Sequence, residues 1–266
     1  MLTDPAALLR VRVRDRAAAL VGEIGAEAAL QCAAAWVEAP QARVRALGFE
    51  VLGDVALNDE RAQVELVARA EAAASDPAVT VREAAVHAIG QSAAKAGRDW
   101  LLQMAGDRHP WVRLAVVSCL PLAAYEPAAD DPVVQALLAA TNDDDIRIRN
   151  WAAFSLGTQL EADSPEIREA LRRLLGQLDQ DTVKDYPGKE ALVGLARRGD
   201  PAALPVVHSC LTGVGVTRMA FEAATALADE SLLPVLLAYR APDNELDDPW
   251  VISLEEAINA CSGHVE

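Results

Sequence analysis

Apolar residues recur along this chain every three or four positions, which is the spacing of one buried face on a helix. The spacing belongs to a ten-residue pattern: a β-branched residue, an Arg, a small or apolar residue three after the Arg, an apolar pair at six and seven, and Gly or Pro at eight. Ser155 is the one polar member of those pairs. Five segments follow the pattern, at residues 13–22, 44–53, 81–90, 112–121 and 148–157.

Weaker copies continue the repeat towards the C-terminus, at 187–196, at 219–228 and from Trp250 onwards. We call the Arg position, or its equivalent, the anchor. The anchors are residues 14, 45, 82, 113, 149, 188, 220 and 251, so successive copies are 31 to 39 residues apart. A second periodic segment lies between consecutive copies, and prolines stand at the connections: Pro77, Pro110, Pro132, Pro165, Pro201 and Pro249. The sequence therefore predicts an all-α fold, a single right-handed α-solenoid of about seven to eight helical hairpins over residues 1–266.

An Asp stands six residues before the Arg in three copies, and the pairs are Asp76 with Arg82, Asp107 with Arg113 and Asp143 with Arg149. Residues 194–211 also fit the pattern ALxxLGDPxALPxLxxxL. With these motifs the chain resembles the HEAT-repeat superfamily, in particular the phycobilisome-lyase HEAT-like repeats of bacteria. The resemblance implies ladders of Asp and Arg along the stack, and a concave face lined by the helix after each Asp. It implies little about function, because this architecture serves many unrelated tasks.

The Asp and Arg also have a physical role that does not depend on the resemblance. An Asp in the turn can accept hydrogen bonds from free N–H groups at the start of the next helix, where its charge suits the helix dipole. The Arg can then pair with the Asp of its own or an adjacent repeat. We therefore expect a structural role for these residues. The last repeats lack the pair, so we expect a less rigid C-terminal end.

The chain is strongly acidic, with a net charge of −16 and only three lysines, Lys95, Lys184 and Lys189. Such a surface repels phosphate backbones, so nucleic acids and anionic membranes are poor partners. A basic protein is a better one, although acidity can also serve solubility alone. No apolar run is long enough to cross a membrane, and the N-terminal residues lack the pattern of a signal peptide. We expect a cytoplasmic bacterial protein that is a monomer on its own.

The usual signatures of an enzyme are missing. The four cysteines are widely scattered, and the sequence holds no HExxH, GxGxxG, P-loop or GxSxG motif. The His-Glu pairs of HEAT-like deoxyhypusine hydroxylases are absent too, and nothing marks a bilin site. His87 and Glu83 could form a weak metal or acid-base pair, but an ordinary surface pair is the simpler interpretation. We predict no catalytic residue, no metal and no cofactor.

The repeat predicts which positions face solvent. A helix turns about 100° per residue, so positions one, five and nine after the anchor point away from the buried stripe. We expect these positions to line a partner-binding groove, acidic in its N-terminal third and apolar in its middle. The candidate groove residues are Phe154, Asn150, Trp151, Leu114, Leu122, Glu50, Asp54, Glu83 and His87.

The aromatic residues of the fifth copy carry the most distinctive signal. Trp151, at position two, is expected to pack at the border of the buried stripe with one ring edge exposed. For Phe154, at position five, core packing and a groove role are equally compatible with the pattern. Trp36, Trp100 and Trp111 are interpreted as filler between helices, since aromatics at helical spacing are usually core.

Three functions stay open from the sequence. The leading hypothesis is a non-enzymatic interaction module that holds a basic protein or peptide in its groove. A narrower form is an immunity or inhibitor protein against a basic toxin or nuclease. The competing class is a HEAT-like enzyme such as an alkylpurine DNA glycosylase, which uses Trp and acidic residues in a cleft. The acidic charge argues against that class, because its cleft must hold DNA.

Overall fold

The structure is a computed structural model that describes residues 19, 21–124, 128–177, 186–213, 216–240 and 248–263. Every regular element within these residues is helical, which confirms the predicted all-α solenoid class. The chain divides into two compact units, residues 1–126 and 127–266. One continuous solenoid over the whole chain stays a prediction. The described helices include none that is long and apolar enough to cross a bilayer.

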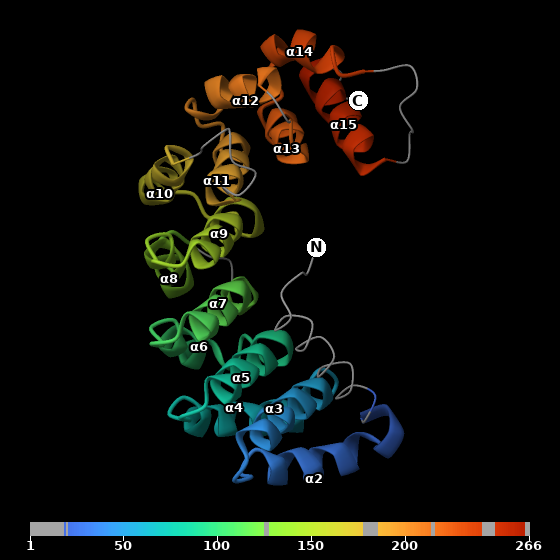
Figure 1. The fold of residues 1–266 in the computed structure, drawn as a ribbon, viewed down its shortest axis with the longest axis vertical. Coiled ribbons are helices and arrows are strands. Elements are labelled where there is room, and N and C mark those ends of the chain that lie inside the picture. Colours follow the sequence, from blue (N-terminus) through green and yellow to red (C-terminus); the bar gives the residue numbers. More distant parts are fainter. Residues whose placement is uncertain are drawn as a thin grey trace. The chain divides into compact units, whose positions relative to one another are not determined.

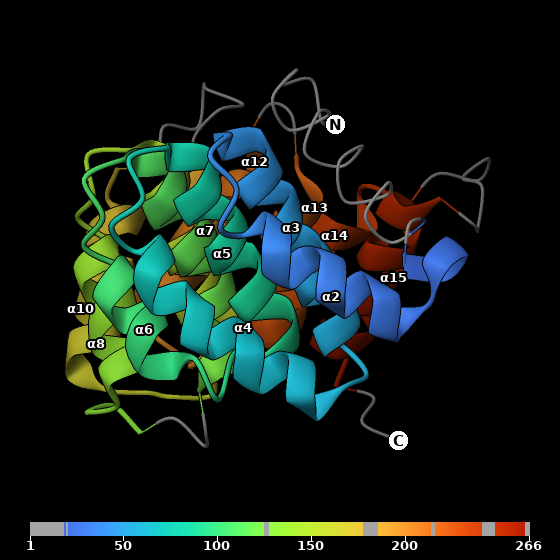
Figure 2. The ribbon, with the colours of Figure 1, turned by 90° about the horizontal axis from the view of Figure 1, so that it is seen from below.

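Unit 1 is a stack of helix pairs (Figure 1). Its described elements are α2 (Ala26–Trp36), α3 (Ala42–Ala56), α4 (Glu60–Ala73), α5 (Val79–Ser92), α6 (Arg98–Met104), α7 (Pro110–Cys119) and the 3₁₀ turn η1 (Leu120–Ala123). The helices α3, α5 and α7 lie side by side, and α4 and α6 lie along them in a second row (Figure 2). Most of the first repeat copy, 13–22, lies outside the described residues.

Unit 2 repeats this arrangement with α9, α11, α13 and α15 in one row and α8, α10, α12 and α14 in the other. Its first elements are α8 (Pro132–Ala140), α9 (Ile146–Phe154), the π-helix η2 (Ser155–Gln159), α10 (Pro165–Leu175) and α11 (Tyr186–Arg197). The remainder are α12 (Ala203–Thr212), α13 (Arg218–Leu227), η3 (Glu230–Leu232), α14 (Leu233–Leu237) and α15 (Pro249–Cys261). We call the helices that carry the repeat anchors, α3, α5, α7, α9, α11, α13 and α15, the anchor helices.

Local sequence explains where several helices begin. Proline occupies the first turn of α7, α8, α10 and α15, where the missing N–H would have had no partner within the helix. Asp131 and Asp248 cap α8 and α15 by accepting the backbone N–H two residues later, at 2.7 and 2.8 Å. The predicted buried stripe is confirmed in α9 and η2, where Ile148, Ala152 and Leu156 are 0% exposed.

The glycine at position eight of the repeat brings neighbouring anchor helices into close contact. It faces position six of the next copy: Gly53 faces Ala88, Gly90 faces Cys119 and Gly157 faces Gly194. A Cβ added to Gly194 would lie 2.6 Å from the Cα atom of Gly157, closer than any side chain permits. Glycine at these three positions therefore allows close backbone approach between neighbouring helices. In these three copies, position eight lies on the side that faces the next anchor helix of the same unit.

Candidate functional site

The Asp and Arg residues of the repeat join consecutive turns of unit 1. Arg82 Nε donates to Asp107 Oδ2 at 2.7 Å, and Arg82 Nη2 donates to Asp107 Oδ1 at 3.0 Å. The two side chains are only 2% and 7% exposed. Arg82 also donates to the backbone oxygen of Asp76 at 2.8 Å, so one guanidinium connects its own turn with the next. Arg45 pairs with the Asp76 carboxylate in the same way, at 2.7 and 2.9 Å.

The same carboxylates cap the turns that precede the anchor helices. Asp76, Asp107 and Asp143 each accept the backbone N–H two residues later, at 2.8, 2.8 and 2.9 Å. Arg113 and Arg149 donate to the backbone oxygens of Asp107 and Asp143, at 3.0 and 2.8 Å. The described hydrogen bonds of the six ladder residues therefore lie within a repeat or join one repeat to the next.

The ladder also fixes the charge state of its acids. Burial alone would raise the pKa of Asp107, but the hydrogen bonds from Arg82 and from the His109 N–H hold this pKa below its usual value. The pKa of Asp76 is lowered for the same reasons, by Arg45 and the N–H of Ala78. Both carboxylates are therefore ionised at neutral pH.

Unit 2 builds its equivalent ladder from residues that the sequence analysis missed. Asp200, whose side chain is 0% exposed, receives Arg172 Nη2 at 2.6 Å and lies 3.6 Å from Arg168 Nη1. Its Oδ1 accepts the N–H of Ala202 at 3.1 Å, which is the capping role of Asp76 transferred to the turn before α12. The arginines come from α10, and so the six-residue Asp-Arg spacing does not reveal them. The lower rigidity expected of the C-terminal end stays a prediction. Its argument was that the last repeats lack Asp-Arg pairs, and that argument does not hold where Asp200 pairs with Arg168 and Arg172.

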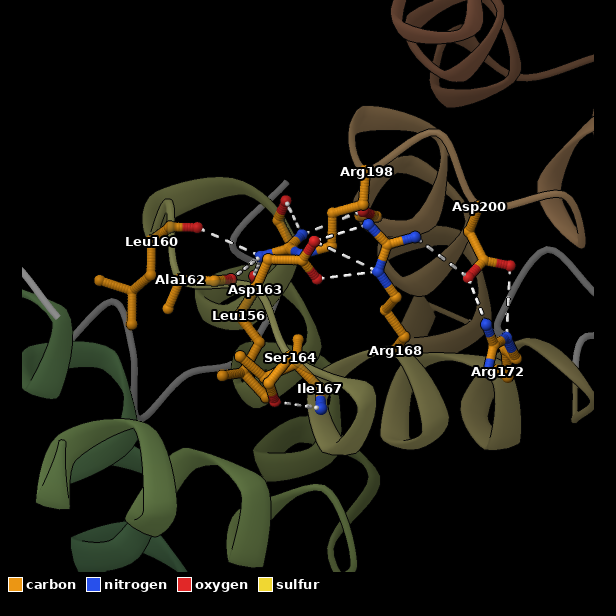
Figure 3. A network of polar contacts seen from close by, with 12 residues as sticks. Leu156, Leu160, Ala162, Asp163, Ser164, Ile167, Arg168, Arg172, Arg198 and Asp200 are labelled. Carbon is orange, nitrogen blue, oxygen red and sulfur yellow. Dashed lines mark hydrogen bonds and ion pairs between the residues drawn. The ribbon is translucent and has the colours of Figure 1, made fainter. Parts of the chain in front are cut away.

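A second buried arginine, Arg198, joins α11 to the π-helix (Figure 3). Its side chain is 7% exposed. Its described hydrogen bonds reach five backbone oxygens, those of Leu156, Gly157, Leu160, Ala162 and Gly194, at 2.5 to 3.3 Å. Carbonyl groups at a helix end lack hydrogen-bond donors within the helix. Here the Arg198 guanidinium supplies the missing donors. Burial lowers the pKa of Arg198, with Asp163, at 3.5 Å from Nε, acting in the opposite direction.

The anchor helices of unit 1 carry the acidic part of the candidate groove. Glu50 and Asp54 are half-buried on α3. Glu83 on α5 is 8% exposed, so the interpretation of Glu83 and His87 as an ordinary surface pair is wrong: the carboxylate is buried by helix packing. The His87 Nε2 atom lies 3.9 Å from Glu83 Oε1, which is too far for a hydrogen bond.

The apolar candidates of unit 1 lie at its C-terminal end. Leu114 is half-buried on α7, and Leu122, 55% exposed, lies in the 3₁₀ turn η1. Leu122 lines a surface hollow of about 520 Å³ together with the end of α5 and the turn after it, residues 90–96. The hollow is of mixed character, because Gln91, Ser92 and Lys95 line it beside Leu122.

The three candidates of unit 2 lie on α9. Trp151 is 37% exposed and Phe154 is half-buried. Their rings meet edge to face, with centroids 5.7 Å apart and planes at 79°. Asn150 is half-buried beside them, and its Oδ1 atom is buried without a hydrogen-bond partner among the described residues. Phe154 is thus in part core packing, while Trp151 keeps an open ring surface as expected.

Not every outward position of the repeat faces solvent. Phe221, at position one of its copy, is 0% exposed and contacts the rings of Tyr239 and Trp250 edge to face. Val193, at position five, is 6% exposed. The expected groove column is therefore wrong at these two positions, as it is at Glu83 in unit 1. Phe221 is buried because the rings of Tyr239 and Trp250 pack on it. Of the expected filler residues, Trp100 is buried, at 6% exposed.

Comparison with known proteins gives the family. The family model for HEAT repeats matches residues 66–157, from α4 to the π-helix η2. This part of the chain carries HEAT repeats. Protein YibA of Escherichia coli K12 is 31% identical over 119 residues, and the same values hold for YibA of strain O157:H7. This match spans 44% of the chain and 40% of the YibA sequence.

Solved structures agree on the fold of this HEAT-repeat protein. The X-ray structure of YibA aligns with a TM-score of 0.70 and 24% identity, over 91% of this chain and 85% of YibA. An engineered protein aligns with a TM-score of 0.57 and 17% identity, over 94% of this chain and 71% of its own. At these identities the likeness shows the fold alone. The closer likeness to phycobilisome-lyase repeats stays a prediction.

The HEAT match covers only some of the residues that form these ion pairs. All six ladder residues fall inside residues 66–157, whereas Arg198 and Asp200 lie beyond the match. A signal for Asp200 was present in the Gly-Asp-Pro turn at 199–201. Within the described ranges no group of three His, Cys, Asp or Glu side chains could hold a metal ion. The four cysteines, all within the described residues, form no disulfide.

Proposed function

We propose that this HEAT-repeat protein is a non-enzymatic interaction module that binds a basic protein or peptide on the outward faces of its anchor helices. The observation that carries the proposal is the ring pair of Trp151 and Phe154, of which Trp151 keeps 37% of its surface exposed. Exposed aromatic rings on a rigid helix are typical anchors of protein interfaces.

The charge of the chain supports a basic partner. The net charge is −16, and the half-buried acidic residues Glu50 and Asp54 lie on the anchor helix α3 of unit 1. Opposite charges raise the rate of encounter and select the partner more than they raise affinity. The partner should therefore bind less tightly as salt rises.

The proposal predicts that substituting one anchor-helix residue in either unit weakens capture of the partner. We expect Phe154→Ala to remove apolar contact and Glu50→Lys to reverse the attraction, each lowering the recovered partner by about tenfold. The measurement is affinity capture from the native host followed by quantitative mass spectrometry. Val64→Ala is the matched control, because Val64 is 73% exposed on α4, outside the anchor helices.

Equal capture by wild type and both variants would contradict the proposal. Each variant must first give the helical content and melting temperature of the wild type, so that a loss of capture reports the surface. Capture of a basic nuclease or toxin would favour the narrower role of an immunity protein. Binding of DNA at physiological salt would instead support a HEAT-like enzyme acting on nucleic acid.

A further inference from the structure

A surface hollow of about 410 Å³ lies within unit 2, where the π-helix η2 ends. Its side chains come from the turn after η2, from the end of α11 and from α13, and they are Leu160, Glu161, Asp163, Arg197, Arg198 and Ala226. Ligand sites in proteins have volumes of about 300–1,000 Å³, and π-helices frequently occur at functional sites. The hollow therefore has the size and the setting of a small-molecule site.

Arg198 places a buried positive charge in the wall of this hollow (Figure 3). Its side chain is 7% exposed, and its Nη1 and Nη2 atoms donate to backbone oxygens, which carry no net charge. Its Nε atom has no hydrogen-bond partner among the described residues, and Asp163 Oδ1 lies 3.5 Å from it. Because Nε is enclosed, Arg198 acts on a molecule in the hollow through its charge rather than through a hydrogen bond.

Arg197 supplies hydrogen-bond donors that a ligand can reach. Its side chain is 41% exposed, and 3.6 Å separates its Nη2 atom from Glu161 Oε1, which is too far for a hydrogen bond. Glu161 is 92% exposed, so its carboxylate can leave Arg197 at little cost. A guanidinium in this position suits the two oxygens of a carboxylate or a phosphate group.

The charges around the hollow leave room for an anion. Burial lowers the pKa of Arg198, and the positive charges of Arg168 and Arg197 lower it further. The carboxylates of Asp163 and Glu161 act in the opposite direction. Asp163 is itself held by Arg168, with 2.6 Å between Oδ2 and Nη2. The exposed Glu161 therefore remains as the loosely held counter-charge of Arg197 and Arg198.

We propose that Arg197 and Arg198 bind the carboxylate or phosphate group of a small molecule in this hollow. The oxyanion takes the place of Glu161 and accepts hydrogen bonds from Arg197, while the charge of Arg198 attracts it from the wall. Leu160 and Ala226 add apolar surface, so the ligand also carries a short apolar group. The inference goes beyond the proposed function, because its ligand is a small anion and its residues are not those proposed to hold a basic protein.

The test is an NMR titration of the full chain, labelled with ¹⁵N-arginine, with butyrate and with butyl phosphate. The shift of the Arg198 backbone N–H signal against concentration gives the dissociation constant. We expect saturable binding to wild type and about tenfold weaker binding to Arg197→Met, which loses the donors but should fold because the residue is exposed. The matched control is Arg147→Met on α9, whose side chain is 44% exposed and pairs with Asp145.

A second variant should change binding in the opposite direction. Glu161→Gln removes the carboxylate that the ligand must displace, so we expect binding to tighten about threefold. A residue with a structural role alone would not give a gain. Glu169→Gln is the matched control, because Glu169 is 72% exposed and lies 3.6 Å from Arg172, which is 41% exposed like Arg197.

The outcomes separate the site from its alternatives. The tighter binder of the two compounds identifies the oxyanion as a carboxylate or a phosphate. The site is overturned if neither compound gives a saturable shift, if Arg197→Met binds as tightly as wild type, or if Glu161→Gln gains no affinity. If inorganic phosphate binds as tightly as butyl phosphate, the assignment of an apolar group to the ligand is wrong. None of these results bears on the protein-binding surface of the anchor helices.

Discussion

Replacing Arg198 with Met should lower the free energy of unfolding by about 3–5 kcal/mol, because five described backbone oxygens lose a charged donor at once. The side chain is only 7% exposed, so water cannot replace the guanidinium without opening the packing between α11 and η2. Met keeps the volume of the stem and isolates the loss of the hydrogen bonds. Urea denaturation gives the size of the effect, and hydrogen exchange gives its location in α9, η2 and α11.

The neighbouring residue provides the control for Arg198. Arg197 is 41% exposed and pairs at 3.6 Å with Glu161, which is 92% exposed. Arg197→Met should therefore change stability by less than about 0.5 kcal/mol. If Arg198→Met is as mild as Arg197→Met, the assignment of Arg198 as the residue that holds the π-helix is wrong.

Arg82→Met is expected to cost about 3–5 kcal/mol, since it leaves the buried Asp107 carboxylate without its charged partner. The loss should depend on pH. Arg82 and the His109 N–H keep the pKa of Asp107 below its unfolded value, so their stabilisation is present above the unfolded pKa and is lost as pH falls through the folded one. The difference between wild type and variant should accordingly shrink on acidification, which urea titrations across the acidic range would measure.

An exposed pair shows whether burial decides the effect of Arg82. Arg61 pairs with Asp59 at 2.8 Å, a distance close to that of the ladder pair, but the Arg61 side chain is 75% exposed. Arg61→Met should leave stability nearly unchanged, because water screens the pair. Equal losses for Arg61→Met and Arg82→Met would contradict the view that the ladder acts through buried charge.

Sequence reasoning succeeds for features set by one repeat and its neighbour. The buried stripe of Ile148, Ala152 and Leu156 follows from helical periodicity alone. The capping role of Asp76 follows from its place in a turn before a helix. The helical wheel also places Trp151 at the border of the buried stripe, in agreement with its partial exposure of 37%.

It fails for contacts that depend on departures from the repeat. Arg198 reaches backbone oxygens 36 to 42 residues earlier, and these are available because a π-helix follows α9. Phe221 is buried because Tyr239 and Trp250 pack on it, and the repeat pattern cannot anticipate that cluster. Glu190 stands at the same repeat position as Trp151, yet its raised pKa arises from packing and from Glu222 on the next anchor helix.

The most direct test of the proposed binding role is photo-crosslinking in the native host. A photoreactive benzoylphenylalanine would replace Phe154 in one variant and Leu237, a 43% exposed residue of α14, in the other. We predict that Phe154→benzoylphenylalanine yields a specific crosslink to a basic protein, that Leu237→benzoylphenylalanine does not, and that raised salt weakens the product. An identical set of products from the two positions, or no protein product at position 154, would contradict the account of the anchor helices as a protein-binding surface.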